Sequence, residues 1–419
     1  MEFKYKIKKL ESGLSLVQLP RKVPSVMVMA MVRAGSRDEK EGQYGGAHFL
    51  EHFVFKGTEK YPQVNEIAKE IDSLGGEQNA FTWTDYTGFW VRLAEEHWKK
   101  GVEVVGQMVS EPLLPADQLE KEKGTVIEEI RMYEDDPKMK AWKEMDESIF
   151  GDTGLGRPTL GSEESIKNMR VEDLENFRDN WYWPENMMVL MAGNLADEES
   201  IVAEIEKEFA GLKKEGKGKR EGYNLEYSQK KPRVVVSRKE TQQAHLALGM
   251  ESFAYSDERK YAWQVLDQIL GANMSSRLWN EIREKRGLAY YVRSGFNGMK
   301  DTGMAYVRAG VRLDEAHQAV DIIKKELVKM GEEKVSEEEL KRGVEGAKGS
   351  LKLSLESSQR TAMRVGNSWA LTGEIKDMDE VIEKLDEVDR KQVQEVARDV
   401  FAAEKMNLSI VGPFEDKDK

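Results

Sequence analysis

Two histidines and a glutamate stand close together near the start of the sequence, at His48, Glu51 and His52. The apolar residues around them recur at helical spacing, which predicts a helix over about residues 47–55. In such a helix His48 and His52 lie one turn apart on one face, so their imidazoles can bind one metal ion. Glu51 lies beside that face, within reach of a metal-bound water. The three residues therefore indicate a metal site with an acid–base group next to it.

A catalytic zinc ion commonly has three protein ligands and one open position, so the chain must supply a further ligand. A second, long helix is predicted over about residues 116–133. It carries Glu122 and Glu129 on one face, because seven residues make about two helical turns. One carboxylate can bind the metal while the other accepts the free N–H of a histidine ring. Glu128 competes with Glu129 for the ligand role, and the spacing alone does not separate them.

The composition restricts the classes of function. The chain has 419 residues, a net charge of -13 and no cysteine. The acidic balance argues against a nucleic-acid partner, and the lack of cysteine excludes disulfides and Cys-rich zinc sites. No run reaches the length of a membrane span and the first residues do not form a signal peptide, so we expect a cytoplasmic protein with no membrane contact.

The pattern of elements predicts two similar halves. Residues 211–222 are rich in glycine and lysine and read as a linker. Residues 1–210 and 223–419 each run through strands, helices, strands, helices and a closing strand, which is a weak internal duplication. We therefore expect an α+β fold of two homologous domains, with the metal-site candidates in the N-terminal one. Each would be a mixed, mostly antiparallel sheet covered by helices.

These residues resemble the M16 (pitrilysin/insulysin-like, inverzincin) zinc peptidases, specifically the short M16B members related to mitochondrial processing peptidase, whose signature is H-x-x-E-H. Three further segments are similar to the family: residues 75–82, 154–161 and 283–290. In that family a Glu about seventy-seven positions after the second His completes the zinc site. Another acidic residue lies seven positions before it. The resemblance therefore favours Glu129 over Glu128 as the ligand, with Glu122 behind a histidine.

The resemblance implies a zinc metalloendopeptidase with one zinc ion per chain, held by His48, His52 and Glu129. Glu51 would be the general base toward a zinc-bound water and would then protonate the leaving amine. The resemblance makes the N-terminal domain catalytic and the C-terminal domain substrate-binding. In the C-terminal domain it implies that Tyr290 helps to stabilise the oxyanion and that Arg283 fixes a substrate carbonyl.

The resemblance also implies how a peptide is held. An extended substrate would add to an exposed strand edge formed by Asn79, Ala80, Phe81 and Thr82. Long family members enclose substrate between two such halves. This chain supplies one half, so we expect a homodimer whose active site is completed across subunits. The substrates would then be peptides or unfolded segments.

A different class of function is a non-catalytic M16-like scaffold or peptide-binding subunit. That alternative predicts a damaged H-x-x-E-H motif or a missing third ligand, and the sequence retains His48, Glu51, His52 and Glu129. We expect the other three histidines to be structural: His97, His245 and His317.

Overall fold

A computed structural model describes residues 4–223 and 229–414 of the chain, which forms two compact units. Unit 1 consists of Met1–Ile130, Arg157–Glu221 and Ser354–Lys376. Unit 2 consists of Arg131–Gly156, Gly222–Leu353 and Asp377–Lys419. The units are therefore interleaved along the sequence, which the linear division into residues 1–210 and 223–419 did not anticipate.

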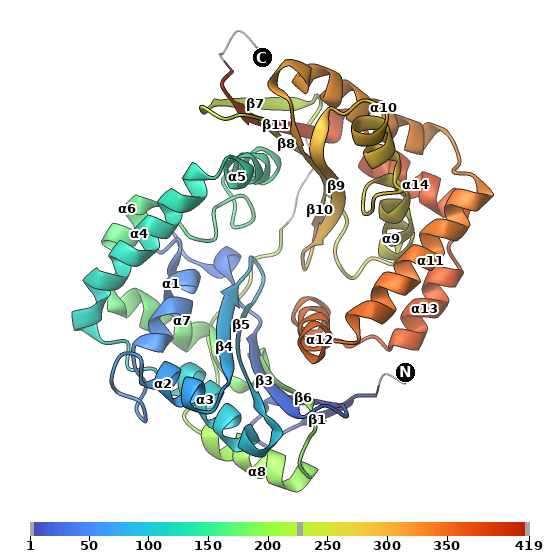
Figure 1. Ribbon diagram of the computed structural model, residues 1–419. Coiled ribbons are helices and arrows are strands. Elements are labelled where there is room, and N and C mark those ends of the chain that lie inside the picture. Colours follow the sequence, from blue (N-terminus) through green and yellow to red (C-terminus); the bar gives the residue numbers. More distant parts are fainter. Residues whose placement is uncertain (1–3, 224–228, 415–419) are drawn as a thin grey trace. The chain divides into compact units, whose positions relative to one another are not determined.

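Unit 1 is built on a six-stranded sheet. Its strands are β1 (Lys6–Lys9), β2 (Ser15–Pro20), β3 (Ser25–Val32), β4 (Glu77–Thr82), β5 (Thr87–Ala94) and β6 (Met187–Gly193). Their order is β1-β2-β6-β3-β5-β4, with β2 parallel to β6 and the other pairs antiparallel. Its helices are α1 (Gly46–Phe53), α2 (Glu66–Ser73), α3 (Trp98–Ser110), α6 (Glu163–Asn168), α7 (Val171–Trp181), α8 (Glu198–Glu208) and α12 (Ser358–Thr372). Helix α4 (Leu119–Asp135) begins in unit 1 and ends in unit 2 (Figure 1).

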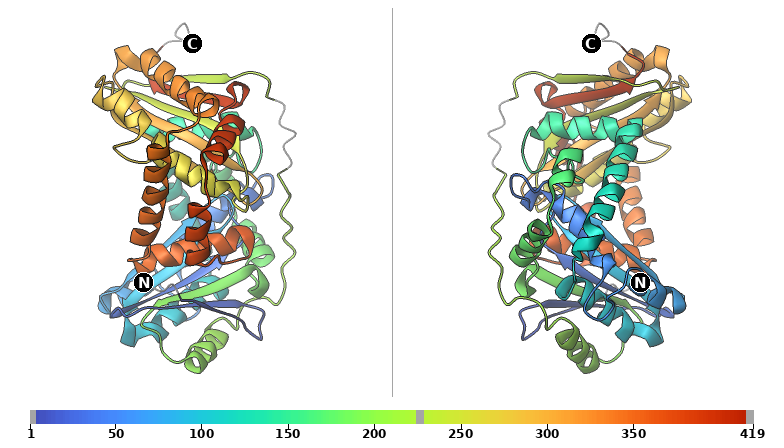
Figure 2. Two further views of the ribbon diagram at one scale, coloured as in Figure 1. Left: turned by 90° about the vertical axis from the view of Figure 1, so that its right-hand side faces the viewer. Right: turned by 90° about the vertical axis from the view of Figure 1, so that its left-hand side faces the viewer.

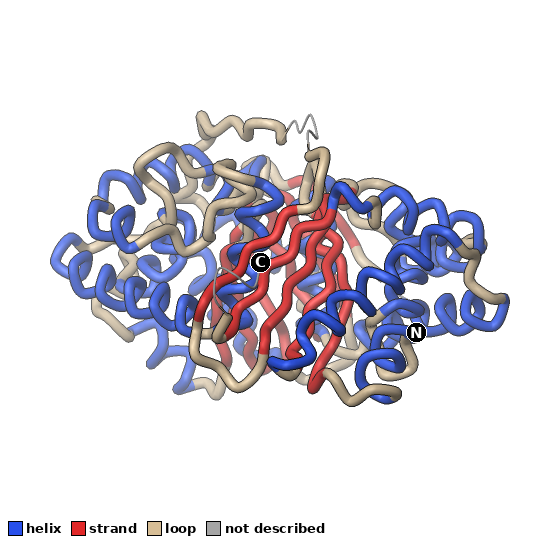
Figure 3. Tube along the Cα trace, turned by 90° about the horizontal axis from the view of Figure 1, so that it is seen from above, coloured by secondary structure: helices blue, strands red, loops and turns tan. Residues whose placement is uncertain are grey.

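Unit 2 repeats the same arrangement with five strands. They are β7 (Arg233–Arg238), β8 (Ala244–Ser252), β9 (Ala289–Gly298), β10 (Gly303–Val311) and β11 (Met406–Gly412). The order is β7-β11-β8-β10-β9, and only β7 and β11 are parallel among these pairs. Its helices are α5 (Pro137–Phe150), α9 (Arg259–Leu270), α10 (Ala316–Glu332), α11 (Glu337–Ser354), α13 (Met378–Asp386) and α14 (Arg390–Val400). Helices flank open sheets (Figure 3), which confirms the predicted α+β class and the internal duplication.

Strand β3 is apolar from Val26 to Val32 because helices cover both of its faces. Val28 faces α3, where an added side-chain carbon on Gly101 would lie 3.1 Å from Val28. Met29 and Met31 face α12, where the same carbon on Gly366 would lie 2.9 Å from Met29. A strand buried on both sides reads as a continuous apolar run, without the alternation of a half-exposed strand.

Helices α5 and α12 account for the interleaving. Helix α5 follows α1–α4 in sequence, but its apolar face packs on the sheet of unit 2, with Met145 and Ile149 clustered with Ala247 and Val411. Helix α12 follows the helices of unit 2 but packs against β3 and β6 of unit 1. Arg33, one residue beyond β3, lies 5.3 Å from the ring of Trp369 on α12. Helix α12 thus covers β3 and β6 of unit 1, and α5 covers the equivalent strands, β8 and β11, of unit 2.

The expected linker follows α8 as an extended segment (Figure 2). It is bound to unit 1 through Arg220, whose guanidinium pairs with the buried carboxylates of Asp38 and Asp85. Arg37 pairs with the same Asp85 at 2.9 Å. Because all four side chains are at most 9% exposed, this segment is anchored, although its composition predicts a free linker.

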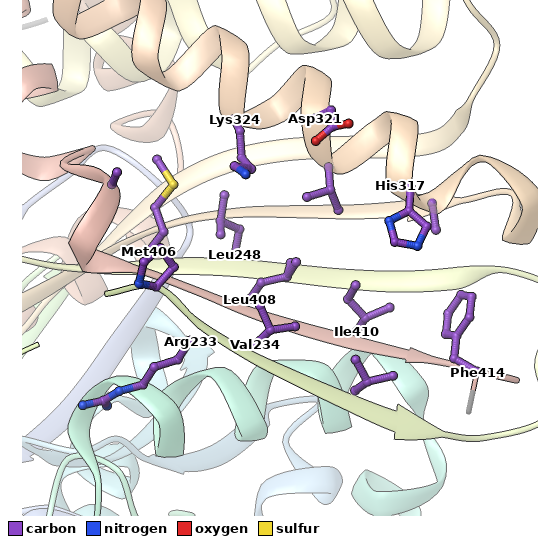
Figure 4. A pocket seen from close by; sticks show the side chains of 15 residues that line it. Arg233, Val234, Leu248, His317, Asp321, Lys324, Met406, Leu408, Ile410 and Phe414 are labelled. Carbon is purple, nitrogen blue, oxygen red and sulfur yellow. The ribbon is translucent and has the colours of Figure 1, made fainter. Parts of the chain in front are cut away.

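A cavity of about 340 Å³ lies in unit 2 between α10 and the strands β7, β8 and β11 (Figure 4). Leu248, Leu408 and Ile410 form part of its apolar wall, and His317 lies at its edge on α10. Within the two described stretches of chain, we find no helix with both the length and the apolar character needed to cross a bilayer.

Candidate metal centre

Helices α1 and α4 bring three potential metal ligands together in unit 1. His48 lies in the first turn of α1, His52 in its last turn, and Glu129 on α4. The Glu129 Oε2 atom lies 3.7 Å from His48 Nε2 and 3.5 Å from His52 Nε2. One ligand atom from each residue lies within 4.8 Å of the others.

This donor set fits a zinc ion. Zinc binds histidine nitrogen and carboxylate oxygen at about 2.0–2.2 Å, so neighbouring ligands of a tetrahedral site lie about 3.3–3.5 Å apart. The observed separations of 3.5 and 3.7 Å are close to that spacing. Two nitrogens and one oxygen leave the fourth position for water or substrate, as in catalytic zinc sites.

His52 is oriented by a pair of charged side chains behind it. Its Nδ1 lies 3.1 Å from Glu122 Oε1, and the other oxygen of Glu122 lies 2.6 Å from Lys56 Nζ. Burial opposes ionisation of Glu122, but His52 and Lys56 lower the pKa of this carboxyl. Burial alone would lower the pKa of His52. The hydrogen bond to Glu122 and the negative charges of the nearby carboxylates outweigh burial and raise this pKa. Sequence reasoning expected Glu122 here and missed Lys56, although Lys56 follows His52 at helical spacing.

His48 has a different environment. Burial is the main cause that lowers the pKa of His48 to about 3, and the nearby His52 lowers it further. The imidazole is therefore neutral and able to bind a metal at neutral pH. Its Nδ1 atom is buried and has no hydrogen-bond partner among the described residues. The ring of His48 therefore lacks the polar support that Glu122 gives to His52.

Glu51 lies beside the three ligands and is only 9% exposed. Thr82, the last residue of β4, donates its hydroxyl to Glu51 Oε2 at 2.7 Å. Burial raises the pKa of Glu51, while the Thr82 hydrogen bond and His52 act against that rise. Thr82, which the sequence suggested only as a substrate contact, thus also holds the carboxylate of Glu51.

The expected substrate strand is the edge of the sheet in unit 1. Strand β4 pairs with β5 and occupies the end of the strand order. Asn79 is exposed, and its Oδ1 accepts the backbone N–H of Ala80 at 2.8 Å. Ala80 and Phe81 are half-buried. An edge strand presents unpaired backbone groups on one side, which is the requirement for adding a further strand.

Arg283 and Tyr290 lie together in unit 2. The Arg283 guanidinium donates to the backbone oxygen of Tyr290 at 2.6 Å and lies 4.3 Å from the ring of Trp279. Tyr290, on β9, is 73% exposed. Arg283 lies in a π-helical turn formed by residues 279–284. Aromatic and backbone contacts thus fix Arg283, while Tyr290 remains accessible.

The other histidines stand apart from the metal group. His245 on β8 has its Nδ1 3.3 Å from the hydroxyl of Tyr291, and His317 lies beside the cavity of Figure 4. His97 ends a short 3-10 turn before α3.

Comparisons with known proteins define the class of this chain. The family model for insulinase (peptidase family M16) matches residues 17–163, and the model for the peptidase M16 inactive domain matches residues 168–346. A relative in Bacillus subtilis, named an uncharacterized zinc protease, is 35% identical over 93% of this chain and 94% of its own length. A Streptomyces coelicolor relative with the same description is 35% identical over 97% of this chain and 89% of its own length. The chain belongs to the M16 peptidase family.

Solved structures share the whole fold. A protease from Helicobacter pylori superposes with a TM-score of 0.91 at 24% identity, covering 98% of this chain and all of that one. An M16-like peptidase from Alicyclobacillus acidocaldarius, described as putative, gives a TM-score of 0.85 at 21% identity, with 99% of each chain covered. The two-unit architecture is therefore that of M16-like peptidases.

Proposed function

We propose that this protein is a zinc-dependent endopeptidase that hydrolyses peptides or unfolded segments. The observation that carries the proposal is the convergence of His48, His52 and Glu129, with the Glu51 carboxylate beside them. Membership of the M16 family and the naming of relatives as zinc proteases support the same reading.

The chemistry divides between the metal and the chain. Zinc in such a site supplies a Lewis acid, which makes water acidic near neutral pH and polarises a peptide carbonyl. Glu51 Oε2 accepts the hydroxyl of Thr82, so we assign Oε1 as the atom that takes a proton from the attacking water. The same carboxyl then gives the proton to the departing amine. Thr82 keeps the Glu51 side chain in one orientation through both transfers.

Substrate binding is assigned to the outer edge of β4. An extended peptide would pair its backbone with Asn79, Ala80, Phe81 and Thr82 as an added strand. Pairing through backbone groups tolerates many side chains, so the enzyme would accept varied sequences. Because Thr82 ends β4 and also contacts Glu51, a peptide on this edge would be led toward the acid–base group.

The second half of the active site is assigned to Arg283 and Tyr290, which would bind the substrate carbonyl and stabilise the oxyanion. We propose that these residues act from the partner subunit of a homodimer, which encloses the substrate in a chamber. The exposure of Tyr290 supports this assignment, because an exposed aromatic side chain with a hydroxyl is suited to contact a second protein or a substrate.

The proposal is tested by measuring zinc content and cleavage of an internally quenched peptide by the purified protein. We expect about one zinc ion per chain, cleavage that stops after chelation, and recovery when zinc is restored. Bound zinc without chelator-sensitive cleavage of any peptide would instead support a non-catalytic scaffold or a peptide-binding subunit.

A further inference from the structure

Glu39 occupies an unusual position before the metal-binding helix. It lies in the loop between β3 and α1, and its two carboxylate oxygens accept the backbone N–H groups of Gly45 and Ala47, both at 2.8 Å. These residues are the N-cap and the second residue of α1. The N-cap, Gly45, has no side chain that could cap the helix, so Glu39 provides this interaction from six residues upstream.

The turn that receives Glu39 is closely packed. Gly45 has a φ of 87°, in the left-handed region that favours glycine. A side-chain carbon added there would lie 2.5 Å from the backbone oxygen of Leu160. A residue with its own capping side chain is therefore excluded from this position, which explains why the cap comes from a distant carboxylate.

The loop that carries Glu39 is fixed as well. Asp38, its neighbour, is fully buried and accepts the backbone N–H of Gly35 at 3.0 Å. Arg220 pairs with Asp38 through two guanidinium nitrogens. The carboxylate of Glu39 is thus presented from a rigid support. Burial raises the pKa of Glu39 to about 8, and the two N–H donors oppose that rise.

The metal ligands depend unequally on this support. His52 lies in the last turn of α1 and is held through its side chain by Glu122. His48 lies in the first turn, where helices fray, and its Nδ1 atom has no hydrogen-bond partner in the described part of the chain. The position of His48 must therefore come from the backbone of the first turn, which Glu39 holds.

We propose that Glu39 is a positioning residue for the zinc site, which caps α1 and thereby fixes His48 in its ligand geometry. The inference rests on the proposed zinc site. In this inference Glu39 supports His48 through the backbone of α1, as Glu122 supports His52 through a side-chain hydrogen bond.

The test compares Glu39→Gln and Glu39→Asp with Glu41→Gln, an exposed neighbour in the same loop. The amide of Gln turns a donor toward one of the two N–H groups, and Asp is too short to reach both. We expect both Glu39 variants to bind zinc about 10–100-fold more weakly in competition with a chromogenic chelator, as for other residues that support ligands. Glu41→Gln should match the wild type. Cobalt substituted into the Glu39 variants should give an altered visible spectrum, reporting a changed ligand set.

A purely structural role for Glu39 would lower the unfolding temperature but leave the zinc affinity and cobalt spectrum of the folded protein unchanged, and that result would overturn the inference. If Glu39→Gln does not fold, Glu39→Asp, which keeps a carboxyl group, decides the question by the same two measurements. Failure of the wild type itself to bind zinc would contradict the proposed function, whereas equal binding by wild type and variants contradicts only the role of Glu39.

Discussion

Glu128 and Glu129 are neighbours on α4 with different surroundings. Glu129 is half-buried and directs Oε2 toward both histidines, while Glu128 is exposed. We expect Glu129→Gln to lower zinc affinity by at least about tenfold, because a neutral amide is a poorer ligand than a carboxylate. Glu128→Gln, the matched control, should bind zinc like the wild type. Chelator competition on the two variants measures the difference, and equal losses would contradict the choice of Glu129.

Three residues of the candidate site could be predicted from the sequence because they lie close together in it. His48, Glu51 and His52 share two turns of one helix, and a fixed helical period brings them together. The hydrogen bond from Thr82 to Glu51 joins a strand to a helix, so no sequence period predicts it. The Glu39 interaction depends on a turn with a left-handed glycine, which also lacks a periodic signal.

At the scale of elements, α3 and α8 pack closely at Gly106. A side-chain carbon added there would lie 2.6 Å from the backbone oxygen of Glu208, which cannot move without shifting α8. We expect Gly106→Ala to destabilise the protein by about 1–3 kcal/mol through overpacking. Gly124→Ala, on α4 with open space around it, should stabilise it by about 0.5–1 kcal/mol through helix propensity. Denaturant unfolding measures the free energy of unfolding of the two variants. Equal changes in both would contradict this account of the contact between α3 and α8.

Helix α5 carries a carboxyl group whose burial affects stability. The Oδ1 atom of Asp146 is buried and has no hydrogen-bond partner within residues 4–223 and 229–414, and burial raises the pKa of Asp146 to about 8. The folded state thus holds a proton that the unfolded state loses above about pH 4, so this group weakens folding progressively between pH 4 and 8. We expect Asp146→Asn to unfold about 2–4 °C above the wild type at pH 8 and to lose most of that advantage near pH 4. Thermal unfolding across this range checks the sign, and an advantage that grows toward low pH would contradict it.

Elements with strong periods were predictable, and their boundaries less so. The long helix predicted over residues 116–133 exists as α4, which covers Leu119–Asp135. Pro137 separates α4 from α5 by beginning the second helix, because proline is tolerated in the first helical turn. The linker over residues 211–222 lacks regular structure as expected, but the buried pairs of Arg220 could not be inferred from its composition.

At the scale of the whole molecule, the duplication explains both the fold and its interleaving. The sequence indicated two similar halves, and the order β7-β11-β8-β10-β9 of unit 2 matches the order β2-β6-β3-β5-β4 of unit 1, where β1 is an additional strand. The exchange of α5 and α12 was not predictable, because an apolar helix face does not specify which of two equivalent sheets it covers. The mixed, mostly antiparallel sheets and the family were predicted correctly.

The proposed homodimer makes a prediction about mixed subunits. We expect the Glu51→Gln and Tyr290→Phe variants each to have little activity alone. After mixing and subunit exchange, some dimers would combine an intact Glu51 with an intact Tyr290 in one site and recover activity toward a quenched peptide. Self-mixed samples of each variant are the control. Absence of any recovery, in mixtures shown by mass to contain heterodimers, would argue against a site shared across subunits.

The central claim is that Glu51 is the proton-transferring base beside a zinc ion held by its neighbours. Glu51→Gln preserves the size of the side chain and removes the base. The decisive measurement is zinc content and peptide turnover of this variant beside the wild type, in the same preparation buffer. We predict one zinc ion per chain in both proteins and a loss of turnover of at least about 100-fold in the variant. Zinc-loaded Glu51→Gln that cleaves peptides at the wild-type rate would contradict the account.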